Sequence, residues 1–166
     1  RLTRVVENLL DLSRLEAGAA EPHRDWTSME EVAQTAVEQV APEHGARLSI
    51  DRDAPLVRAD GAQLERAMVN LIENAARHSG GHPISVRGRQ VGSKLVIRVV
   101  DRGPGIPDQD LERVFDAFHS GTAGGDGHKG AGLGLAIARG FVEANDGHIF
   151  AESLPGQGTA FVIELP

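Results

Sequence analysis

Two asparagines and an arginine recur along one face of a predicted helix. Asn70, Asn74 and Arg77 lie at i, i+4 and i+7 within GAQLERAMVNLIENAARHS, roughly opposite its apolar stripe. Asparagine is a poor helix former because its amide competes for backbone hydrogen bonds, so two on one face carry a cost. Amide oxygens suit a hard cation such as Mg²⁺, and a guanidinium one turn further on suits phosphate. A solvated helix face is the alternative interpretation of such residues taken alone.

A second group of candidate residues follows a predicted strand. Asp101 ends the alternating run KLVIRVVD, and Gly103 and Gly105 follow it in DRGPGIP. A carboxylate in this place can accept a hydrogen bond from an exocyclic amine, and glycines let a flat ring lie against the backbone. An ordinary turn after a strand is the alternative interpretation.

The third group is a glycine-rich run that leads into a helix. Gly130, Gly132 and Gly134 occupy alternate positions at the start of the apolar pattern LGLAIARGFVEAN. The free N–H groups and the positive dipole end of a helix N-terminus form an anion site, which indicates a phosphate. The run is not a P-loop, because Lys129 is followed by Gly130 and not by Ser or Thr. The spacing G-x-G-x-G also differs from the dinucleotide motif G-x-G-x-x-G.

The loop before this helix is also unusual. Residues 120–132 read SGTAGGDGHKGAG, which is nearly half glycine. Such a loop is either a disordered connection or a lid over a ligand. We expect the segment from about residue 119 to residue 131 to be mobile without a nucleotide, because so much glycine does not hold one conformation unaided.

Composition narrows the class of protein. The chain has 166 residues, a net charge of −7 and no cysteine. This length suits one domain with a tail, and the acidic balance argues against nucleic acid or an anionic membrane as partner. Without cysteine there is no disulfide, thiolate nucleophile or Cys-ligated zinc. The apolar runs are too short to span a bilayer, no signal peptide opens the chain, and its start inside a helical pattern indicates a fragment.

The elements that position these residues follow from periodicity. A helix over residues 1–18 places Leu2, Val5, Leu9 and Leu12 on an a/d seam, and we expect it to pack on a helix outside this sequence. Residues 19–25 are linker-like. A second helix begins after Ser28, its expected N-cap, and runs to about residue 41.

The remainder alternates between helices and strands. We expect strands at 47–51, 84–90, 94–101, 148–153 and 159–166, and helices at 61–79 (capped by Asp60), around 111–115 and at 133–145. Antiparallel hairpins with helices long enough to cover one face predict a two-layer α/β sandwich.

Together these segments resemble a known family. NLIENAARH is similar to the N box, DRGPGIP to the G1 box, VFDAFHSG to the F box, GAGLGLAIARGFVEANDGHI to the G2 box and GQGTAFVIELP to the G3 segment of the ATP-binding (HATPase_c, GHKL superfamily) domain of bacterial sensor histidine kinases. The boxes occur in the right order over residues 26–166. RVVENLLDLSRLEAG resembles the end of the dimerisation and phosphoacceptor hairpin, and WTSMEEV with ADGAQLERAMVNLIENA is similar to the KdpD type.

The resemblance implies a fold and a domain order. The fold is the Bergerat type, a mixed β-sheet backed by three helices and preceded by a helical tail. Residues 1–18 would be the end of the phosphoacceptor hairpin, residues 19–25 a linker and residues 26–166 the catalytic domain.

The resemblance also implies roles for individual residues. Asn70 and Asn74 would hold Mg²⁺ on the phosphates of ATP, Arg77 would reach the phosphate chain, and His78 would lie against the base. Asp101 would meet the adenine amine, with Thr159 at the same edge. The nucleotide-binding set is completed by Gly103, Gly105 and Ile106 after the strand, and by Gly130, Gly132, Leu133, Gly134 and Leu135 at the triphosphate.

Two phenylalanines of the F box have two interpretations. Phe115 and Phe118 would anchor the base of the lid by resemblance, while plain core aromatics are at least as good an account.

The residue at position 70 bears on the reaction. Related ATPases and serine kinases carry a glutamate general base where this chain has Asn70, and an amide cannot take a proton from water or serine. A histidine imidazole is already a competent nucleophile, so the sequence favours phosphoryl transfer to histidine. None of the seven histidines lies in a phosphoacceptor motif, so the acceptor lies outside this chain and no catalytic residue is assigned.

The expected partners follow from this interpretation. They are ATP or ADP with Mg²⁺, the phosphoacceptor hairpin of the same kinase and a response regulator. We expect a homodimer for the full-length protein, a monomer for this fragment, and a cytoplasmic domain of a membrane-anchored kinase. The alternatives are a GHKL-type ATPase and a nucleotide-binding module without kinase activity.

Overall fold

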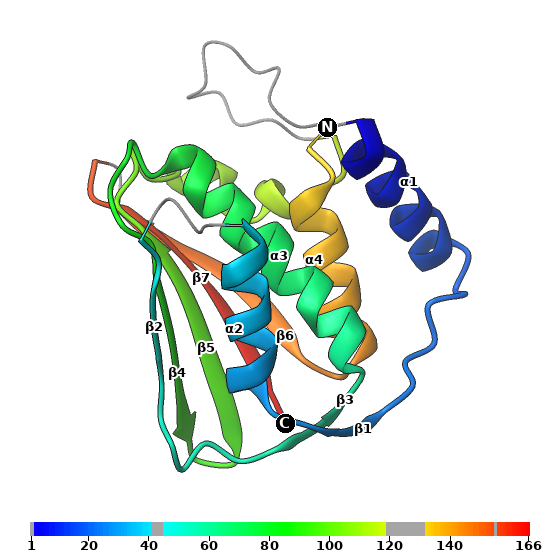
Figure 1. The fold of residues 1–166 in the computed structure, drawn as a ribbon. Helices are drawn as coiled ribbons and strands as arrows, with labels where there is room; N and C mark the ends of the chain where they lie inside the picture. Colours follow the sequence, from blue (N-terminus) through cyan, green and yellow to red (C-terminus); the bar gives the residue numbers. More distant parts are fainter. Residues whose placement is uncertain (1, 41–44, 119–131, 155) are drawn as a thin grey trace.

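A computed structural model gives the structure of the chain and describes residues 2–40, 45–118, 132–154 and 156–166. Its main body has two layers, a sheet on one side and helices on the other (Figure 1). This arrangement confirms the predicted α/β sandwich.

The large sheet has five strands in the order β2-β4-β5-β7-β6. Strands β2 and β4 are parallel, and the other neighbours are antiparallel, so the sheet is mixed as expected. The strands are β2 (Arg47–Ile50), β4 (Ser85–Val91), β5 (Lys94–Asp101), β6 (His148–Leu154) and β7 (Gly158–Leu165).

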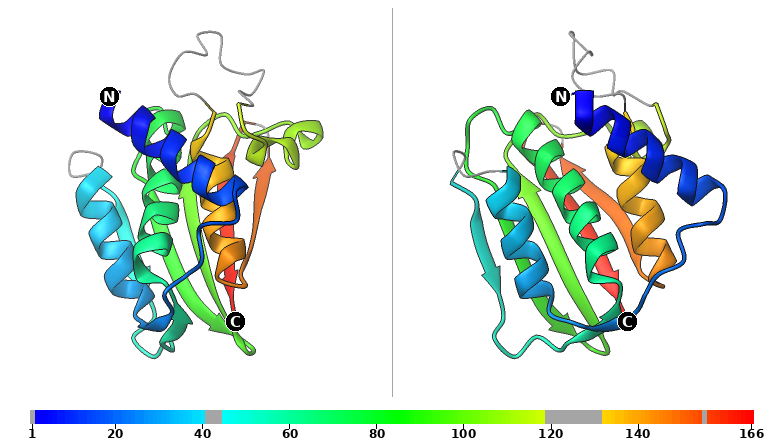
Figure 2. Two further views of the ribbon diagram at one scale, coloured as in Figure 1. Left: turned by 90° about the vertical axis from the view of Figure 1, so that its right-hand side faces the viewer. Right: turned by 45° about the vertical axis from the view of Figure 1, so that its right-hand side comes forward.

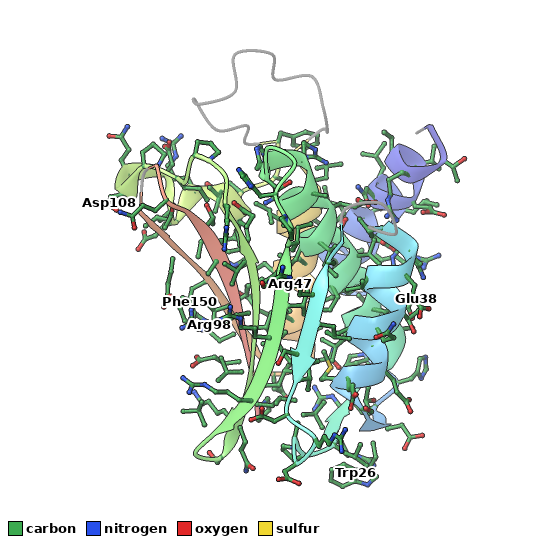
Figure 3. All side chains as sticks on the ribbon, turned by 60° about the vertical axis from the view of Figure 1, so that its left-hand side comes forward. Trp26, Glu38, Arg47, Arg98, Asp108 and Phe150 are labelled. Carbon is green, nitrogen blue, oxygen red and sulfur yellow. The ribbon has the colours of Figure 1, made fainter. Side chains whose placement is uncertain are left out.

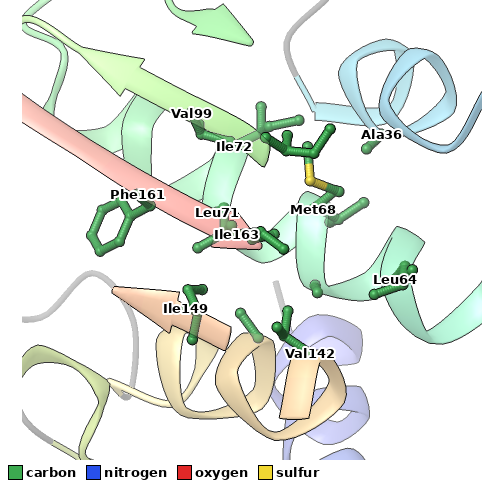
Figure 4. Close-up of a cluster of buried hydrophobic side chains, with 14 of the residues drawn as sticks. Ala36, Leu64, Met68, Leu71, Ile72, Val99, Val142, Ile149, Phe161 and Ile163 are labelled. Carbon is green, nitrogen blue, oxygen red and sulfur yellow. The ribbon is translucent and has the colours of Figure 1, made fainter. Parts of the chain in front are cut away.

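Three helices cover one face of this sheet, as two further views show (Figure 2). They are α2 (Met29–Val40), α3 (Gly61–His78) and α4 (Gly134–Ala144). The predicted apolar stripe of α3 is confirmed, because Leu64, Met68 and Leu71 are fully buried. They pack toward sheet residues such as Ile163, as seen in the close-up of the core (Figure 4). Burial of this stripe fixes the opposite side of α3, which carries the polar residues.

The predicted N-caps of two helices are also confirmed. The side chain of Asp60 accepts a hydrogen bond from the backbone N–H of Gln63 at 3.1 Å, and α3 begins at the next residue. The Ser28 hydroxyl accepts from the backbone N–H of Glu31 at 3.4 Å at the start of α2. Each cap satisfies one of the free N–H groups of its helix.

Several short elements differ from the prediction. Strands β1 (Asp25–Thr27) and β3 (Val57–Ala59) form a separate antiparallel pair that periodicity did not predict. Three residues are too few to show alternation, and each strand exists because its partner lies beside it. The single short helix expected around residues 111–115 is instead two 3₁₀ turns, Asp108–Asp110 and Arg113–Phe115.

The first helix, α1 (Leu2–Glu16), packs within the chain, which differs from the expected partner outside it. Arg4 forms an ion pair with Glu73 of α3, and Asp11 accepts from Arg66 of α3 at 2.5 Å. Leu15 lies against Gly140 of α4. Two members of the predicted seam remain exposed, Val5 at 41% and Leu9 at 46%, and so do their neighbours Val6 and Leu10.

The predicted linker is hydrogen-bonded to the main body. The Ala20 carbonyl accepts from the Gln63 side chain at 3.0 Å, and the His23 N–H donates to the Asp60 carboxylate at 2.9 Å. Arg24 donates to the Ala144 carbonyl at 3.0 Å and pairs with Asp146. Residues 19–25 therefore lie along the start of α3 and the end of α4. None of the helices in the described part of the chain is long and apolar enough to cross a membrane.

Candidate functional site

The polar face of α3 carries three side chains that have no hydrogen-bond or ion-pair partner among the described residues. Asn70 is buried, Asn74 is half-buried and Arg77 is exposed. Within the described residues, none of the three makes a side-chain hydrogen bond or an ion pair. Neighbouring Glu73 is different, because Arg4 of α1 engages its carboxylate. A buried amide with no internal partner is available to a ligand.

Asn70 lies beside the start of α4. A Cβ built onto Gly134, the first residue of α4, would lie 3.3 Å from Oδ1 of Asn70. No side chain caps this helix, since its N-cap residue Leu133 makes no side-chain hydrogen bond. The structure therefore brings an amide side chain and the free N–H groups of a helix N-terminus together, an arrangement that suits an anion with its counter-cation.

A polar hollow opens on another side of Asn70. Its volume is about 200 Å³, and it is lined by Arg4, Glu7, Gln39, Glu65, Arg66 and Val69. Among the described residues, no three His, Cys, Asp or Glu side chains are grouped to hold a metal ion. The amide oxygens of Asn70 and Asn74 are acceptable ligands for Mg²⁺ when phosphates supply the remaining charge.

Asp101 ends β5 and is 3% exposed. Its Oδ1 accepts a hydrogen bond from the backbone N–H of Gly103 at 2.8 Å. Burial raises the pKa of this carboxyl, and the raise is opposed by the Gly103 N–H, by nearby His78 and by the Thr159 N–H. Thr159 is the register partner of Asp101 on β7, so the structure brings these two predicted residues together.

The turn after Asp101 depends on glycine for packing. A side chain at Gly103 would overlap the carbonyl oxygen of His78, at the end of α3. Gly105 has φ +81°, a left-handed conformation that favours glycine. The turn therefore packs closely on the end of α3 at Gly103. This packing requires a glycine for a structural reason, whereas contact with a flat ligand was the reason expected from the sequence.

Ser153 of β6 supports the same turn, and sequence reasoning missed it. Its hydroxyl accepts from the Ile106 N–H at 2.5 Å and donates to the Gly158 carbonyl at 3.1 Å. The Ser153 Oγ also lies 3.4 Å from the Thr159 Oγ1. Ser153 could have been proposed as a site residue only from its pairing with Thr159 across β6 and β7. That pairing cannot be derived from the sequence alone.

His78 is the last residue of α3, and the residue as a whole is exposed to solvent. The pKa of its imidazole is lowered by desolvation and by Arg77, while Asp101 acts to raise it. The ring is therefore neutral at pH 7, which leaves it an uncharged flat surface beside Asp101.

Most of the predicted residues gather at one end of the molecule. The end of α3, the end of β5 with its turn, and the start of α4 lie together at the top of Figure 1. Leu133 is buried, while Gly132 and Leu135 are half-buried. Gly130 and the predicted mobile loop 119–131 lie outside the described residues.

The two phenylalanines have different environments. Phe115 is buried and packs edge-on against Phe161, with ring centroids 5.9 Å apart, which supports the core interpretation. Phe118 is 66% exposed and has φ 66°. Its backbone N–H donates to the carbonyl of Gly132 at 3.0 Å, just before α4.

The sequence is similar to sensor kinases over nearly its whole length. Residues 59–166 match the family described as histidine kinase-, DNA gyrase B-, and HSP90-like ATPase. Sensor protein KdpD of Escherichia coli is 34% identical over 167 residues, covering 99% of this chain and 19% of KdpD. The histidine-protein kinase AfsQ2 of Streptomyces coelicolor is 36% identical over 166 residues, covering 100% of this chain and 31% of AfsQ2. The chain thus spans about a fifth of KdpD.

Solved structures have the same architecture. Full-length ShkA in complex with AMPPNP has a TM-score of 0.84 and 26% identity, covering 99% of this chain and 35% of ShkA. The mycobacterial sensor histidine kinase MprB has a TM-score of 0.73 and 30% identity, covering 88% of this chain and 96% of MprB.

Proposed function

We propose that this chain is the ATP-binding catalytic domain of a sensor histidine kinase. The chain belongs to the histidine kinase-, DNA gyrase B-, and HSP90-like ATPase family, which supports this proposal. The observation that carries the proposal is the unpartnered polar face of α3, where Asn70 lies against the uncapped start of α4. The γ-phosphoryl group of ATP would pass to a histidine outside this chain, with ADP as the leaving group.

The adenine end of the site would be formed by β5 and its turn. The Asp101 carboxylate would accept a hydrogen bond from the exocyclic amine, with Thr159 at the same edge and the neutral ring of His78 beside the base. Gly103 packs on α3, so its part would be to shape the turn, while Gly105 and Ile106 would line the ring. The complex of ShkA with AMPPNP supports an adenine nucleotide as the ligand of this fold.

The phosphate end would be formed by the two helices. Asn70 and Asn74 offer amide oxygens without internal partners, a donor set that fits Mg²⁺, and Arg77 offers a guanidinium for the phosphate chain. Backbone N–H groups from Gly132 to Leu135 would receive the phosphates, with Gly130 preceding them in sequence. Bound Mg²⁺ would neutralise phosphate charge and orient the γ-phosphoryl group.

Two residues favour transfer to histidine over hydrolysis. Asn70 cannot act as a general base, since an amide does not take a proton at neutral pH. Glu73, the nearest carboxylate on α3, is engaged by Arg4. Among the described residues of this helix face, water thus lacks a free carboxylate base, whereas an imidazole acceptor is already a competent nucleophile and needs less help.

The proposal extends to the longer protein that such a domain serves. Residues 1–18 would be the end of the phosphoacceptor hairpin, residues 19–25 its connection and residues 26–166 the catalytic domain. The hairpin of the same kinase and a response regulator would be the partners, in a homodimer anchored to a membrane with this domain on the cytoplasmic side. The names of the relatives as sensor proteins support this extension.

The direct test mixes the chain with labelled ATP, Mg²⁺ and a separately made phosphoacceptor hairpin from a relative. We expect label on the hairpin histidine, and we expect Asn74→Ala to abolish most of it. Gln34→Ala on the exposed face of α2 is the control and should transfer label normally. Phosphate release at the same rate with and without the hairpin would instead indicate an ATPase, and nucleotide binding without either product would indicate a module without kinase activity.

A further inference from the structure

We propose that the solvent-facing side of the five-stranded sheet is a docking surface for an acidic protein partner. This outer sheet face consists of the strand residues that alternate with the buried ones, for example Arg87 and Arg89 of β4 around buried Gly88. Helices α2, α3 and α4 lie on the other side of the sheet, and the outer face with Arg98 and Phe150 is open in the view of Figure 3. The proposal goes beyond the kinase function and does not depend on it.

The outer sheet face is basic although the protein is acidic. Its five basic side chains are Arg47, Arg87, Arg89, Lys94 and Arg98, and its two acidic ones are Glu152 and Glu164. Five positive and two negative charges leave +3 on this face, in a chain whose net charge is −7. A Coulombic field of this sign steers acidic surfaces toward the sheet.

The strand register brings like charges together. Arg87 of β4 lies directly opposite Arg98 of β5, and its neighbour on β2 is Ser49. Directly opposed like charges destabilise an antiparallel pair. An ion pair with Glu152 at 2.8 Å offsets the positive charge of Arg98, and Lys94 lies 3.9 Å from Glu164. Both glutamates of this face are therefore already in ion pairs.

The other arginines have no such relief. In the part of the chain that the structure describes, Arg47, Arg87 and Arg89 make no ion pair, and Asp51 at the end of β2 is not paired with them. Folding alone does not account for an arginine that faces another arginine across two strands. Carboxylates of a partner would supply what the sheet lacks, and arginine binds carboxylates in a bidentate manner.

Apolar side chains lie among these charges. Val96, Val100 and Phe150 are half-buried on the same face, and Val162 is 1% exposed although no helix covers it. Arginine with aromatic and aliphatic neighbours is typical of protein interfaces. Because aliphatic and aromatic side chains alternate with the arginines, a protein with carboxylates and apolar side chains is the occupant that this pattern favours.

The test uses a fluorescein-labelled peptide of alternating Glu and Val residues, followed by fluorescence anisotropy at low salt. We expect the intact chain to bind it, with amide chemical-shift changes on β4 and β5. We expect the double variant Arg87→Gln/Arg89→Gln to bind about tenfold more weakly. The matched control is Arg14→Gln/Arg113→Gln, which removes the same charge from two exposed arginines away from the sheet and should bind within twofold of the intact chain.

Two further measurements keep the proposal falsifiable. Arg87→Thr should raise the melting temperature, because it removes the repulsion with Arg98 and threonine suits a strand. A lower melting temperature would assign Arg87 a structural role and overturn the inference. Absence of peptide binding, equal weakening by both double variants, or binding to phosphatidylglycerol vesicles in place of the peptide would also overturn it. Loss of ATP binding would leave these readouts unchanged, so the two proposals fail separately.

Discussion

Asp101 is the residue at which base recognition can be tested most sharply. If its carboxylate accepts from the adenine amine, GTP presents a carbonyl there, and two acceptors face each other in a buried place. An unpaired buried polar group costs about 1–3 kcal/mol, so ATP should bind roughly tenfold to a hundredfold more tightly than GTP. Asp101→Asn should narrow this preference, because the amide can rotate to offer a donor.

The fold should survive this substitution. An asparagine oxygen can still accept from the Gly103 N–H, as the Asp101 carboxylate does at 2.8 Å. Calorimetry with ATP and GTP beside the melting temperature separates the two roles. Equal affinity of the intact chain for ATP and GTP would show that Asp101 does not recognise the base. A lower melting temperature of Asp101→Asn with an unchanged preference for ATP over GTP would show that Asp101 only stabilises the turn.

His78 makes stability depend on pH in a predictable direction. Desolvation and Arg77 lower the pKa of its imidazole below the ordinary 6.5. As the pH falls through 6.5, the unfolded chain takes up a proton at His78 that the folded chain does not. The free energy of unfolding therefore decreases as the pH falls below 6.5. The loss is complete once the pH passes the folded pKa.

The variant His78→Gln should therefore lose less stability between pH 7.5 and pH 5 than the intact chain does, in roughly the range where histidine titrates. Denaturant unfolding at several pH values measures the difference. Asp101, with a raised pKa, acts in the opposite direction at more acidic pH, and it is present in both proteins. Parallel stability curves for the two proteins would contradict the prediction.

Gly103 should not tolerate a side chain. Gly103→Ala would push a methyl group into the His78 carbonyl, and overpacking of this kind costs about 1–3 kcal/mol. Gly156→Ala is the matched comparison, because Gly156 has φ +84° but open space around its Cβ position, so its cost is about 1 kcal/mol of backbone strain. Denaturant unfolding should rank Gly103→Ala as the more damaging change.

The sequence predicts which residues could carry the chemistry, but it does not predict how they are held. The spacing of Asn70, Asn74 and Arg77 predicted their shared face, which the apolar stripe of α3 then confirms. The role of Ser153 and the packing at Gly103 could not be predicted, because both depend on contacts between segments about 50 and 25 residues apart.

At the scale of elements, the long periodic segments were predictable and the short ones were not. α2, α3, α4 and the five strands of the sheet show period 3.6 or period 2 over at least four residues. β1 and β3 have three residues each and are defined by pairing across 30 residues of chain. The packing of residues 19–25 on the main body could not be predicted from the sequence either, because their hydrogen-bond partners lie at the ends of α3 and α4.

Asn145 at the end of α4 should hold that linker in place. It is 1% exposed, accepts from the Asp60 N–H at 2.8 Å and donates to the Gln63 side chain at 2.9 Å and to the Phe141 carbonyl. Asn145→Ala leaves the Asp60 N–H and the Gln63 carbonyl without their partner, at a cost of about 1–3 kcal/mol.

Hydrogen exchange on residues 19–25 tests the positional part of this prediction. We expect faster exchange in Asn145→Ala than in the intact chain, since Asp60 and Gln63 are also the residues that bond the linker. The control Gln34→Ala should leave the linker as it is. Unchanged exchange in Asn145→Ala would mean that the linker is held independently of this network.

At the scale of the whole molecule, we expect the isolated chain to be monomeric. Leu12 of the seam and neighbouring Leu15 pack on the core of the same chain, so this end of α1 is not available to other copies. Light scattering at micromolar concentration should give about the chain mass of 17.6 kDa. Twice that mass, reduced by Leu9→Ser on the exposed part of the seam, would contradict the expectation.

The two ion pairs between α1 and α3 have a consequence for how α1 can move. Arg4 and Asp11 are one heptad apart on α1, as are Arg66 and Glu73 on α3. Each helix carries the cation before the anion, and because the two helices run antiparallel, each cation meets an anion. A slide of one turn, about 5.4 Å, breaks both pairs and creates no replacement of opposite sign between these four residues. A shift of α1 along α3 would therefore lose both ion pairs without compensation, so these four residues fix the register in which α1 packs on α3.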